Sequence, residues 1–176
     1  FTMMLTWKTG RTILYMHLKN EAMALEPFIE AIGAHPPTRV AGNAIFMTPN
    51  PDGVPHAMLH NLKHNQILHE RVVLMTIETT DTPTVQNDDR ISIQDLGKGF
   101  LRIVVRYGFM ENPEVPKALQ LCEKLGMSFD MMSTTFYLAR ESVVPAKKSH
   151  LATWRGYLFK LMAKNATSAT DFFKIP

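Results

Sequence analysis

Histidine, the side chain used most often for metal binding and for proton transfer near neutral pH, is concentrated in one stretch of this chain. The sequence has seven histidines in 176 residues, and His56, His60, His64 and His69 all lie within residues 55–73. On a helix, His60 and His64 would face the same side and could bind one metal ion. A catalytic zinc site would also need a third ligand and a general base, and the HExxH pattern, which combines two histidine ligands with a glutamate base, does not occur here.

The same segment has a structural interpretation, which we favour over a metal site. Leu59 and Leu62 would form the buried side of a helix, and the neighbouring histidine and asparagine side chains could hydrogen-bond carbonyl groups at strand ends. Glu70 and Arg71 would point to opposite sides before a buried strand, where each could anchor a partner or mark the rim of a sheet. We therefore expect no metal, no cofactor and no catalytic residue in this segment. A structural or interface role is predicted for His60, Asn61, His64, Asn65, His69, Glu70 and Arg71.

Three other stretches contain residue types that are used in catalysis or ligand binding. PNPDG, residues 49–53, would follow a buried strand, where open α/β sheets bind ligands, but no GxxxxGK or GxGxxG phosphate motif accompanies it. Cys122 shares a helical face with apolar residues and is predicted to be a buried, inert thiol. Residues 167–173, TSATDFF, contain serine and aspartate, yet we expect a polar turn that leads into a short apolar strand. A nucleotide pocket at PNPDG is the alternative that stays open.

The elements that must position these residues follow from hydrophobic periodicity and from the turn residues between the apolar runs. Apolar residues at steps of three and four predict a helix over residues 14–32, in which Pro27 either produces a kink or begins a second helix. A strand at 44–48, a helix at 55–66 and a strand at 71–79 together make a βαβ unit with parallel strands.

The second half of the chain continues this mixture of strands and helices. Alternating apolar residues predict a β-hairpin with strands at 90–96 and 100–109. A helix with proline near its start and glycine at its end is expected at 113–126, and a further strand within 134–144. The last predicted helix, 151–164, would carry Leu151, Trp154, Leu158 and Leu161 on its apolar face. The fold class that results is α/β, with a mixed β-sheet of about four to five strands covered by helices.

The N-terminal residues have the pattern of a transmembrane helix that leaves the bilayer on its cytoplasmic side. FTMMLTW is apolar, and the basic residues Lys8 and Arg11 follow it. We therefore favour residues 1–10 as the remnant of a last transmembrane helix over the alternative, a frayed leader that packs on the domain. Residues 11–41 would form a connecting helix and linker, and residues 42–176 a cytosolic α/β domain.

Composition excludes several classes of protein. Hydrophobic residues make up 45% of the chain and charged residues 20%, as in an ordinary globular domain. The net charge of +3 is too small, and too evenly spread, for a surface that binds nucleic acid. The single cysteine excludes an internal disulfide and a cysteine-based zinc site, and it favours an intracellular location.

Long motifs in the chain resemble those of a known family. GNAIFMTPNPDGVPHAMLHNLKHNQILHERVVLMTIET, residues 42–79, closely resembles a signature in the C-terminal region of bacterial KUP-type (KUP/HAK/KT) potassium uptake permeases. RYGFMENPEVPKAL, FYLARESVVP and NATSATDFFKIP resemble three further signatures in the family's order, and WKTGR resembles its exit from the last transmembrane helix. The histidines and asparagines discussed above match the first signature as a block.

The resemblance implies a transporter rather than an enzyme. Such permeases couple potassium uptake to protons, as K⁺:H⁺ symporters of the cell inner membrane. The potassium and proton sites would belong to a transmembrane part that is missing from these 176 residues. The chain would then be a cytosolic regulatory and dimerisation domain, with its own transmembrane domain and a second copy as partners. The alternative is a nucleotide-binding sensor domain that controls the same transporter, and neither role implies a cofactor or a nucleic-acid partner.

Overall fold

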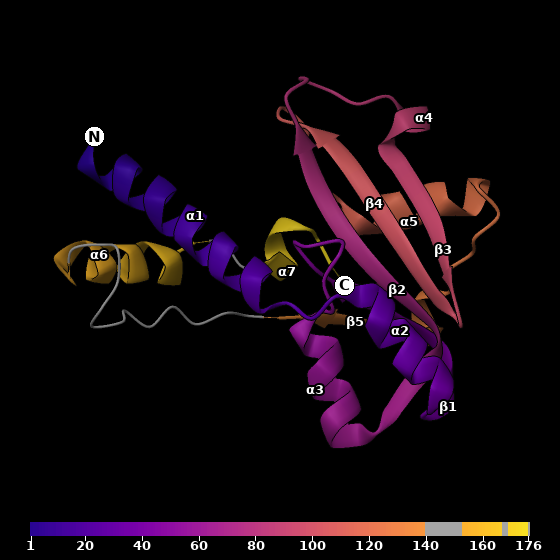
Figure 1. Cartoon of the computed structure of the whole chain (residues 1–176). Coiled ribbons are helices and arrows are strands. Elements are labelled where there is room, and N and C mark those ends of the chain that lie inside the picture. The colour runs from indigo at the N-terminus through magenta and orange to yellow at the C-terminus, as the bar shows by residue number, and fades with distance from the viewer. Residues whose placement is uncertain (140–152, 167–168, 176) are drawn as a thin grey trace. The chain divides into compact units, whose positions relative to one another are not determined.

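The computed structural model describes residues 1–139, 153–166 and 169–175, and these divide into two compact units. The first unit contains residues 1–22 together with the described residues 153–166. The second unit contains residues 23–139 and 169–175. Figure 1 labels the helices and strands that make up both units.

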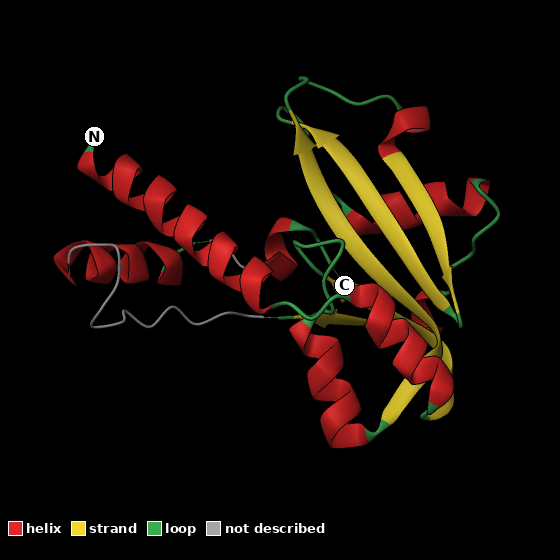
Figure 2. Ribbon diagram, in the orientation of Figure 1, coloured by secondary structure: helices red, strands yellow, loops and turns green. Residues whose placement is uncertain are grey.

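A five-stranded sheet forms the centre of the second unit (Figure 2). Its strands, in the order β3-β4-β2-β1-β5, are β1 (Thr38–Met47), β2 (Ile67–Thr80), β3 (Ile91–Gly97), β4 (Phe100–Gly108) and β5 (Thr134–Leu138). β1, β2, β4 and β5 run parallel to one another, and β3 pairs with β4 in the antiparallel sense. The predicted α/β class, mixed sheet, βαβ unit and hairpin are therefore confirmed.

One face of this sheet is covered by α2 (Leu25–Ala34) and α3 (His56–Asn65). Apolar side chains of both helices share a core with Phe46, Leu74 and Phe100, of which none is more than 1% exposed. Burying one such side chain stabilises a fold by about 1.5–3 kcal/mol. This core holds the two helices on the sheet.

The opposite face is covered by α5 (Val115–Lys124). Ile45, Val73 and Ile103 are fully buried there together with Cys122. Since consecutive strand residues point to opposite faces, Ile45 belongs to this core and its neighbour belongs to the other. The buried thiol of Cys122 agrees with its predicted position on an apolar helical face.

The predicted helix over residues 14–32 is in fact two helices. α1 (Thr2–Glu21) ends at Ala22, and α2 begins at Leu25. Pro27 lies in the first turn of α2, where a missing N–H breaks no intrahelical hydrogen bond. Of the two predictions for Pro27, a kink or the start of a second helix, the second is therefore correct, although the second helix begins two residues before the proline.

β1 begins at Thr38, earlier than the strand predicted at residues 44–48, so part of the predicted linker belongs to the sheet. A bulge after Val40 interrupts the pairing with β2 and obscures the strand pattern in the sequence. Gly42 has a φ of 103° in this bulge, and a Cβ at this position would lie 2.6 Å from the Ser133 carbonyl oxygen. Only glycine avoids both the strained backbone and the close contact.

Two short helical turns precede strands in this unit. α4 (Asn87–Arg90) leads into β3, and a 3₁₀-helix (Met131–Ser133) leads into β5. β5 falls at the start of the strand predicted within 134–144. The later part of that prediction, and the predicted start of the last helix, fall on residues 140–152, which lie outside the described residues.

The C-terminal part of the second unit forms a short helix where we predicted a turn and a short strand. α7 (Ala169–Phe172) is followed by a turn, and the Val115 N–H donates a hydrogen bond to the Phe173 carbonyl oxygen (3.1 Å). Ile175 is 9% exposed and belongs to the core beneath α5. These residues close the core beside the start of α5, and they pair with no strand among the described residues.

In the first unit, α1 and α6 (Thr153–Lys164) lie side by side. The ring centroids of Trp7 and Phe159 are 5.6 Å apart, and Arg155 Nε donates a hydrogen bond to Thr6 Oγ1 (3.0 Å). Among the described helices, none combines the length and the apolar content that crossing a membrane requires.

The apolar face that we predicted for the last helix is not its packed face. Trp154 and Leu161 are each 59% exposed, whereas Phe159 is 4% exposed and contacts α1. Leu158 is half-buried, and Leu151 lies outside the described residues. The periodicity identified an apolar side of α6 correctly, but the described residues pack through a different side.

Candidate functional site at the edges of the sheet

The asparagines of the predicted segment join the end of α3 to the start of β2. Asn61 is 6% exposed, and its Nδ2 donates a hydrogen bond to the Ile67 carbonyl oxygen (3.1 Å). Its Oδ1 accepts a hydrogen bond from Asn65 Nδ2 (2.8 Å). Gln66, with a φ of 56°, ends the helix in the left-handed conformation and turns the chain toward β2. Both amide side chains are therefore used to fix this turn.

The histidines do not converge on one point. His56, His60 and His64 are exposed on α3, with ring centroids of His60 and His64 5.3 Å apart. His69 lies instead on β2, where it faces the edge of the Tyr137 ring at 6.2 Å. Within the described part of the chain, no group of three or more histidine, cysteine or acidic side chains is arranged to hold a metal ion. That the whole chain binds no metal stays a prediction.

His69 and Arg39 lie near the amino ends of β2 and β1, at the end of the sheet opposite to the carboxyl ends of the parallel strands. His69 Nδ1 is buried without a hydrogen-bond partner among the described residues, and burial lowers the pKa of this imidazole below its ordinary 6.5. Arg39 Nη1 donates to the His69 carbonyl oxygen (2.7 Å), and Nη2 donates to that of Lys98 (3.0 Å). The Arg39 guanidinium lies 5.4 Å from the centre of the Phe100 ring, and burial lowers its pKa. Sequence reasoning missed Arg39 because it placed this residue in a linker.

Glu70 and Arg71 point to opposite sides of β2, as expected for consecutive strand residues. Glu70 is exposed. Arg71 Nη1 donates to the Ser128 carbonyl oxygen (3.2 Å), and its guanidinium lies 5.9 Å from the centre of the Phe129 ring. Arg71 therefore connects β2 to the segment that precedes β5.

The loop of residues 48–55, which contains PNPDG, follows the carboxyl end of β1 and is paired with the segment that enters α2. The Leu25 N–H donates to the Asp52 carbonyl oxygen (3.2 Å), and the Val54 N–H donates to that of Met23 (2.9 Å). Val54 is only 2% exposed, so its side chain anchors the loop in the core beside α2. We refer to these two hydrogen bonds as the 23–25/52–54 pairing.

The same loop also contacts the polar part of the sheet. Arg102 on β4 lies 3.4 Å from Asp52 Oδ1 through Nη2, and its Nη1 donates to Gln94 Oε1 (3.1 Å). Arg102 Nε and Thr76 Oγ1 are buried and have no partner among the described residues. Because Leu74 of β2 lies opposite Arg102 in register, the Thr76 and Arg102 side chains project from the same face of the sheet.

A second hydrogen-bonded centre, which sequence reasoning missed, lies at the carboxyl ends of β2 and β4. Glu111 Oε2 accepts hydrogen bonds from the N–H groups of Val85 (3.1 Å) and Gly108 (2.7 Å). Its Oε1 accepts from Arg90 Nη2 (2.6 Å), and the Arg90 guanidinium lies 4.9 Å from the centre of the Tyr107 ring. The hydrogen bond from Arg90, with smaller effects of the two backbone donors, lowers the pKa of Glu111. A carboxylate held in this way is a weak base.

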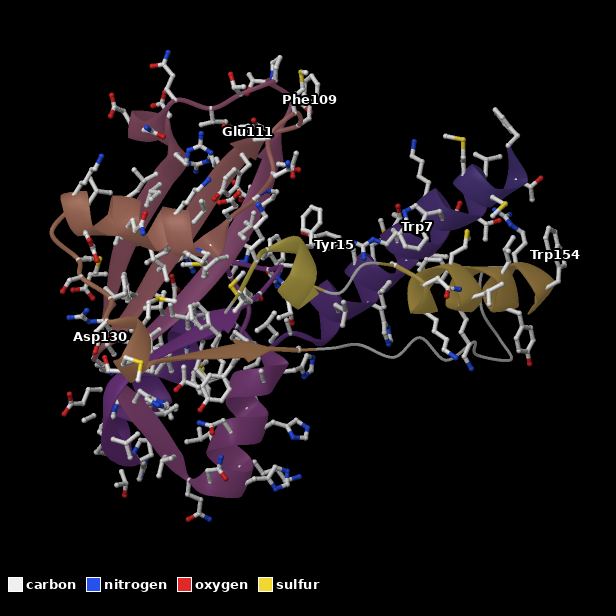
Figure 3. The ribbon with its side chains drawn as sticks, turned by 180° about the vertical axis from the view of Figure 1, so that it is seen from behind. Trp7, Tyr15, Phe109, Glu111, Asp130 and Trp154 are labelled. Atoms are coloured by element: carbon white, nitrogen blue, oxygen red, sulfur yellow. The ribbon has the colours of Figure 1, made fainter. Side chains whose placement is uncertain are left out.

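Figure 3 shows Glu111 and Phe109 at one end of the sheet and Asp130 at the other. Beside Glu111, an open cleft of about 580 Å³ is lined by residues of α4, β4 and α5. At its rim, Glu114 accepts hydrogen bonds from Lys117 (2.7 Å) and Lys174 (2.5 Å), and these lower the pKa of its carboxyl group. The acidic groups of the cleft are therefore already paired within the domain.

Cys122 has the chemistry of an inert thiol. It is fully buried in α5, and this burial raises the pKa of the thiol to about 11. Only the thiolate is an effective nucleophile, and almost none is present near neutral pH.

Comparison with known proteins adds information that the geometry alone does not contain. Residues 41–176 match the family described as the K⁺ potassium transporter C-terminal domain. The chain is 52% identical over 177 residues to the probable potassium transport system protein Kup 2 of Dechloromonas aromatica, and 49% identical over 176 residues to the Kup protein of Myxococcus xanthus. These matches cover 100% of this chain but only 28% and 27% of the two relatives. No solved structure matches the chain.

Proposed function

Because this chain belongs to the family of potassium transporter C-terminal domains, we propose that it is the cytosolic regulatory and dimerisation domain of a proton-coupled potassium uptake transporter. The curated relatives are named as probable potassium transport system proteins, and the chain spans about 28% of the length of the first of them. We assign residues 1–10 to the end of a last membrane span, 11–41 to the connection, and 42–176 to the cytosolic domain. The potassium and proton sites are assigned to the part of the transporter outside this chain.

The observation that carries a regulatory role is the 23–25/52–54 pairing. The chain that leaves α1 is hydrogen-bonded within a few residues to the loop after β1, through the Leu25 and Val54 N–H groups. A displacement of the connecting segment relative to the sheet must therefore move this loop or break these hydrogen bonds. A domain linked in this way biases two states of an attached transporter when it packs differently in each.

We assign no enzymatic activity to the domain. Glu111 and Glu114 are engaged by arginine, lysine and backbone groups, and the thiol of Cys122 is buried. His56, His60 and His64 are exposed on α3, and no described group of three or more histidine, cysteine or acidic side chains could hold a metal ion. A structural or interface role for His60, Asn61, His64, Asn65, His69, Glu70 and Arg71 is part of this proposal.

The regulatory role is tested by a pair of substitutions at one position in the full-length transporter. Leu25→Pro removes the N–H that donates to Asp52, while proline is well accepted at the first residue of a helix. The preceding residue, Ala24, already has the extended conformation (φ −63°, ψ 136°) that proline requires of it. Leu25→Ala is the matched control, because it also removes the buried side chain but retains the N–H.

Potassium and rubidium uptake is measured for both variants at matched membrane levels. We expect Leu25→Pro to lower uptake or its regulation more than Leu25→Ala, with an unchanged preference between the two ions. Equal uptake by the two variants, with the Leu25→Pro domain shown to be folded, would contradict the regulatory role. A changed ion preference would contradict the assignment of the pathway to another part of the transporter.

Dimerisation is the second part of the proposal, and sedimentation of the 176-residue chain tests it. The apolar face of α2 is buried in its own domain and is not available to a second copy. Tyr15 and Met16 on α1 are 48% and 58% exposed, and they offer an apolar contact for a second copy. Only monomer at tens of micromolar would count against self-association through this chain.

A nucleotide-binding sensor remains the second candidate because of polar groups on the face of the sheet that carries Arg102, which contacts Asp52 of the 48–55 loop. The loop follows the carboxyl end of a parallel strand, and Thr76 Oγ1 and Arg102 Nε are buried on that side of the sheet without a partner among the described residues. Calorimetry of the chain with a panel of nucleotides distinguishes the two roles. Micromolar binding that is lost in Thr76→Val would favour the sensor.

A further inference from the structure

The outward side of α6 is apolar, and no described residue of the first unit covers it. Trp154, Tyr157 and Leu161 are 59%, 62% and 59% exposed. They are spaced by three and four residues and therefore lie on one side of the helix. Phe159, on another side, is 4% exposed against α1. α6 thus has one apolar side that packs within the unit and a second that faces outward.

The charges of α6 are all positive. Its charged side chains are Arg155, Lys160 and Lys164, and the helix contains no acidic residue. Lys160 and Lys164 are exposed, and the rotation of the helix places both on one border of the outward apolar side, next to Tyr157. Tryptophan and tyrosine beside an apolar strip, with lysines at its border, are typical of a helix that lies in the interface of an anionic bilayer.

α6 contacts α1 over residues 6–10 of α1. Phe159 packs on Trp7, and a Cβ added at Gly10 would lie 2.5 Å from the Phe159 ring, so glycine permits the close approach. Arg155 donates its hydrogen bond to Thr6. This is the level at which the apolar residues of α1 give way to Lys8 and the basic residues after it.

We propose that α6 binds the surface of an anionic phospholipid bilayer. Trp154, Tyr157 and Leu161 enter the boundary between headgroups and acyl chains, and Lys160 and Lys164 lie at the lipid phosphates. The position of α6 at the membrane surface rests on the proposed function, because that function takes α1 as the end of a membrane span. The residue types on the outward side of α6 do not depend on it. α6 is then a second attachment of the domain to the membrane, beside the covalent one.

The test follows Trp154 in the 176-residue chain with the substitution Trp7→Phe, which leaves a single tryptophan of the two. The probe is a vesicle of roughly three parts phosphatidylcholine to one part phosphatidylglycerol, and pure phosphatidylcholine vesicles are the comparison. We expect Trp154 emission to shift to shorter wavelength on the anionic vesicles and to be quenched by lipids brominated near the headgroup. Lys160→Gln and Lys164→Gln should each weaken binding about fivefold, and salt should weaken it further.

Controls separate α6 from the exposed apolar residues elsewhere in the chain. Leu161→Asp should abolish the shift of Trp154, while Phe109→Ser, which removes a side chain of similar exposure (58%) in the second unit, should leave it unchanged. The inference is overturned if the chain does not bind, or if it binds while Trp154 stays in water. It is also overturned if Trp154 shifts without lipid in a dimer that Leu161→Asp dissociates, because a second copy then covers α6.

The outcome is separable from that of the proposed function. If Trp154 stays in water while Leu25→Pro still lowers uptake more than Leu25→Ala, the lipid contact is wrong and the regulatory role stands. If Trp154 enters the bilayer while the two variants at position 25 transport equally, the lipid contact stands without that role.

Discussion

Replacing Glu111 with glutamine removes a charge at the hydrogen-bonded centre that organises the loops after β2 and β4. The carboxylate accepts from Arg90, Val85 and Gly108, and the Arg90 and Glu111 side chains are only 10% and 22% exposed. In Glu111→Gln one oxygen becomes an NH₂ group, which must face either Arg90 or the two backbone N–H groups, all of them donors. Breaking a buried ion pair costs about 3–5 kcal/mol. Since Glu111 keeps some contact with water, we expect a loss of about 2–3 kcal/mol in the free energy of unfolding.

The pH dependence of this loss distinguishes the mechanism from a general packing defect. The folded-state pKa of Glu111 is below its ordinary 4.5, so the unfolded state takes up the proton first as the pH falls. The stabilisation by Glu111 is therefore complete above pH 4.5 and is lost as the pH falls through the folded-state pKa. The difference in unfolding free energy between the parent chain and Glu111→Gln should be constant near neutral pH and should shrink below that value.

Urea unfolding followed by circular dichroism between neutral and acid pH measures this difference. Glu114→Gln is the matched control, because its partners Lys117 and Lys174 are 71% and 57% exposed and water screens both pairs. It should have the smaller effect at neutral pH. Equal stability of Glu111→Gln and the parent at pH 7, or a difference that does not change with pH, would refute the reasoning.

Three further substitutions or reactions test the remaining parts of the fold. Asn61→Ala should lose about 1–2 kcal/mol in chemical denaturation and more than Asn65→Ala, because Asn61 also bonds a backbone carbonyl. Cys122, whose pKa is about 11, should react with a thiol reagent at pH 8 only as fast as the domain unfolds, and rapid labelling would contradict its burial. Gly42→Ala should lose more than about 1 kcal/mol, because its φ of 103° and a contact of 2.6 Å both oppose a Cβ. Gly97→Ala, at a φ of 78° with nothing within 4 Å, should lose less, and the opposite order would show that the bulge is not strained.

Hydrophobic periodicity predicted correctly the helices and strands that have one face buried in the core and the other face less buried. Residues 101–107 of β4 alternate between buried and half-buried, and Ile103 and Val105 are fully buried, so this pattern could be recognised without knowing the neighbouring strands. The helix–strand turn at Asn61 was also predictable in kind, since a polar side chain between a helix and a buried strand needs a hydrogen-bond partner. The identity of that partner, the Ile67 carbonyl oxygen, depends on the left-handed Gln66.

Where prediction failed, the deciding contact joins residues far apart in sequence. The bulge at Gly42 disturbs the alternation of β1, so Arg39 was assigned to a linker although it binds the His69 carbonyl oxygen. Two of the three donors to Glu111, the Val85 N–H and Arg90, come from a segment across the sheet end, which no local pattern encodes. In α6 the sequence contains two apolar sides, and periodicity cannot say that Phe159 faces α1 and Trp154 faces outward.

Several polar side chains at the two ends of the sheet hydrogen-bond to the backbone of other segments. Arg39, Asn61 and Arg71 each donate to a backbone carbonyl of another segment, and Glu111 accepts from backbone N–H groups. Each of these hydrogen bonds ties two segments of the domain together. Fixed links of this kind fit the proposed regulatory role, in which the domain packs differently in two states of the transporter.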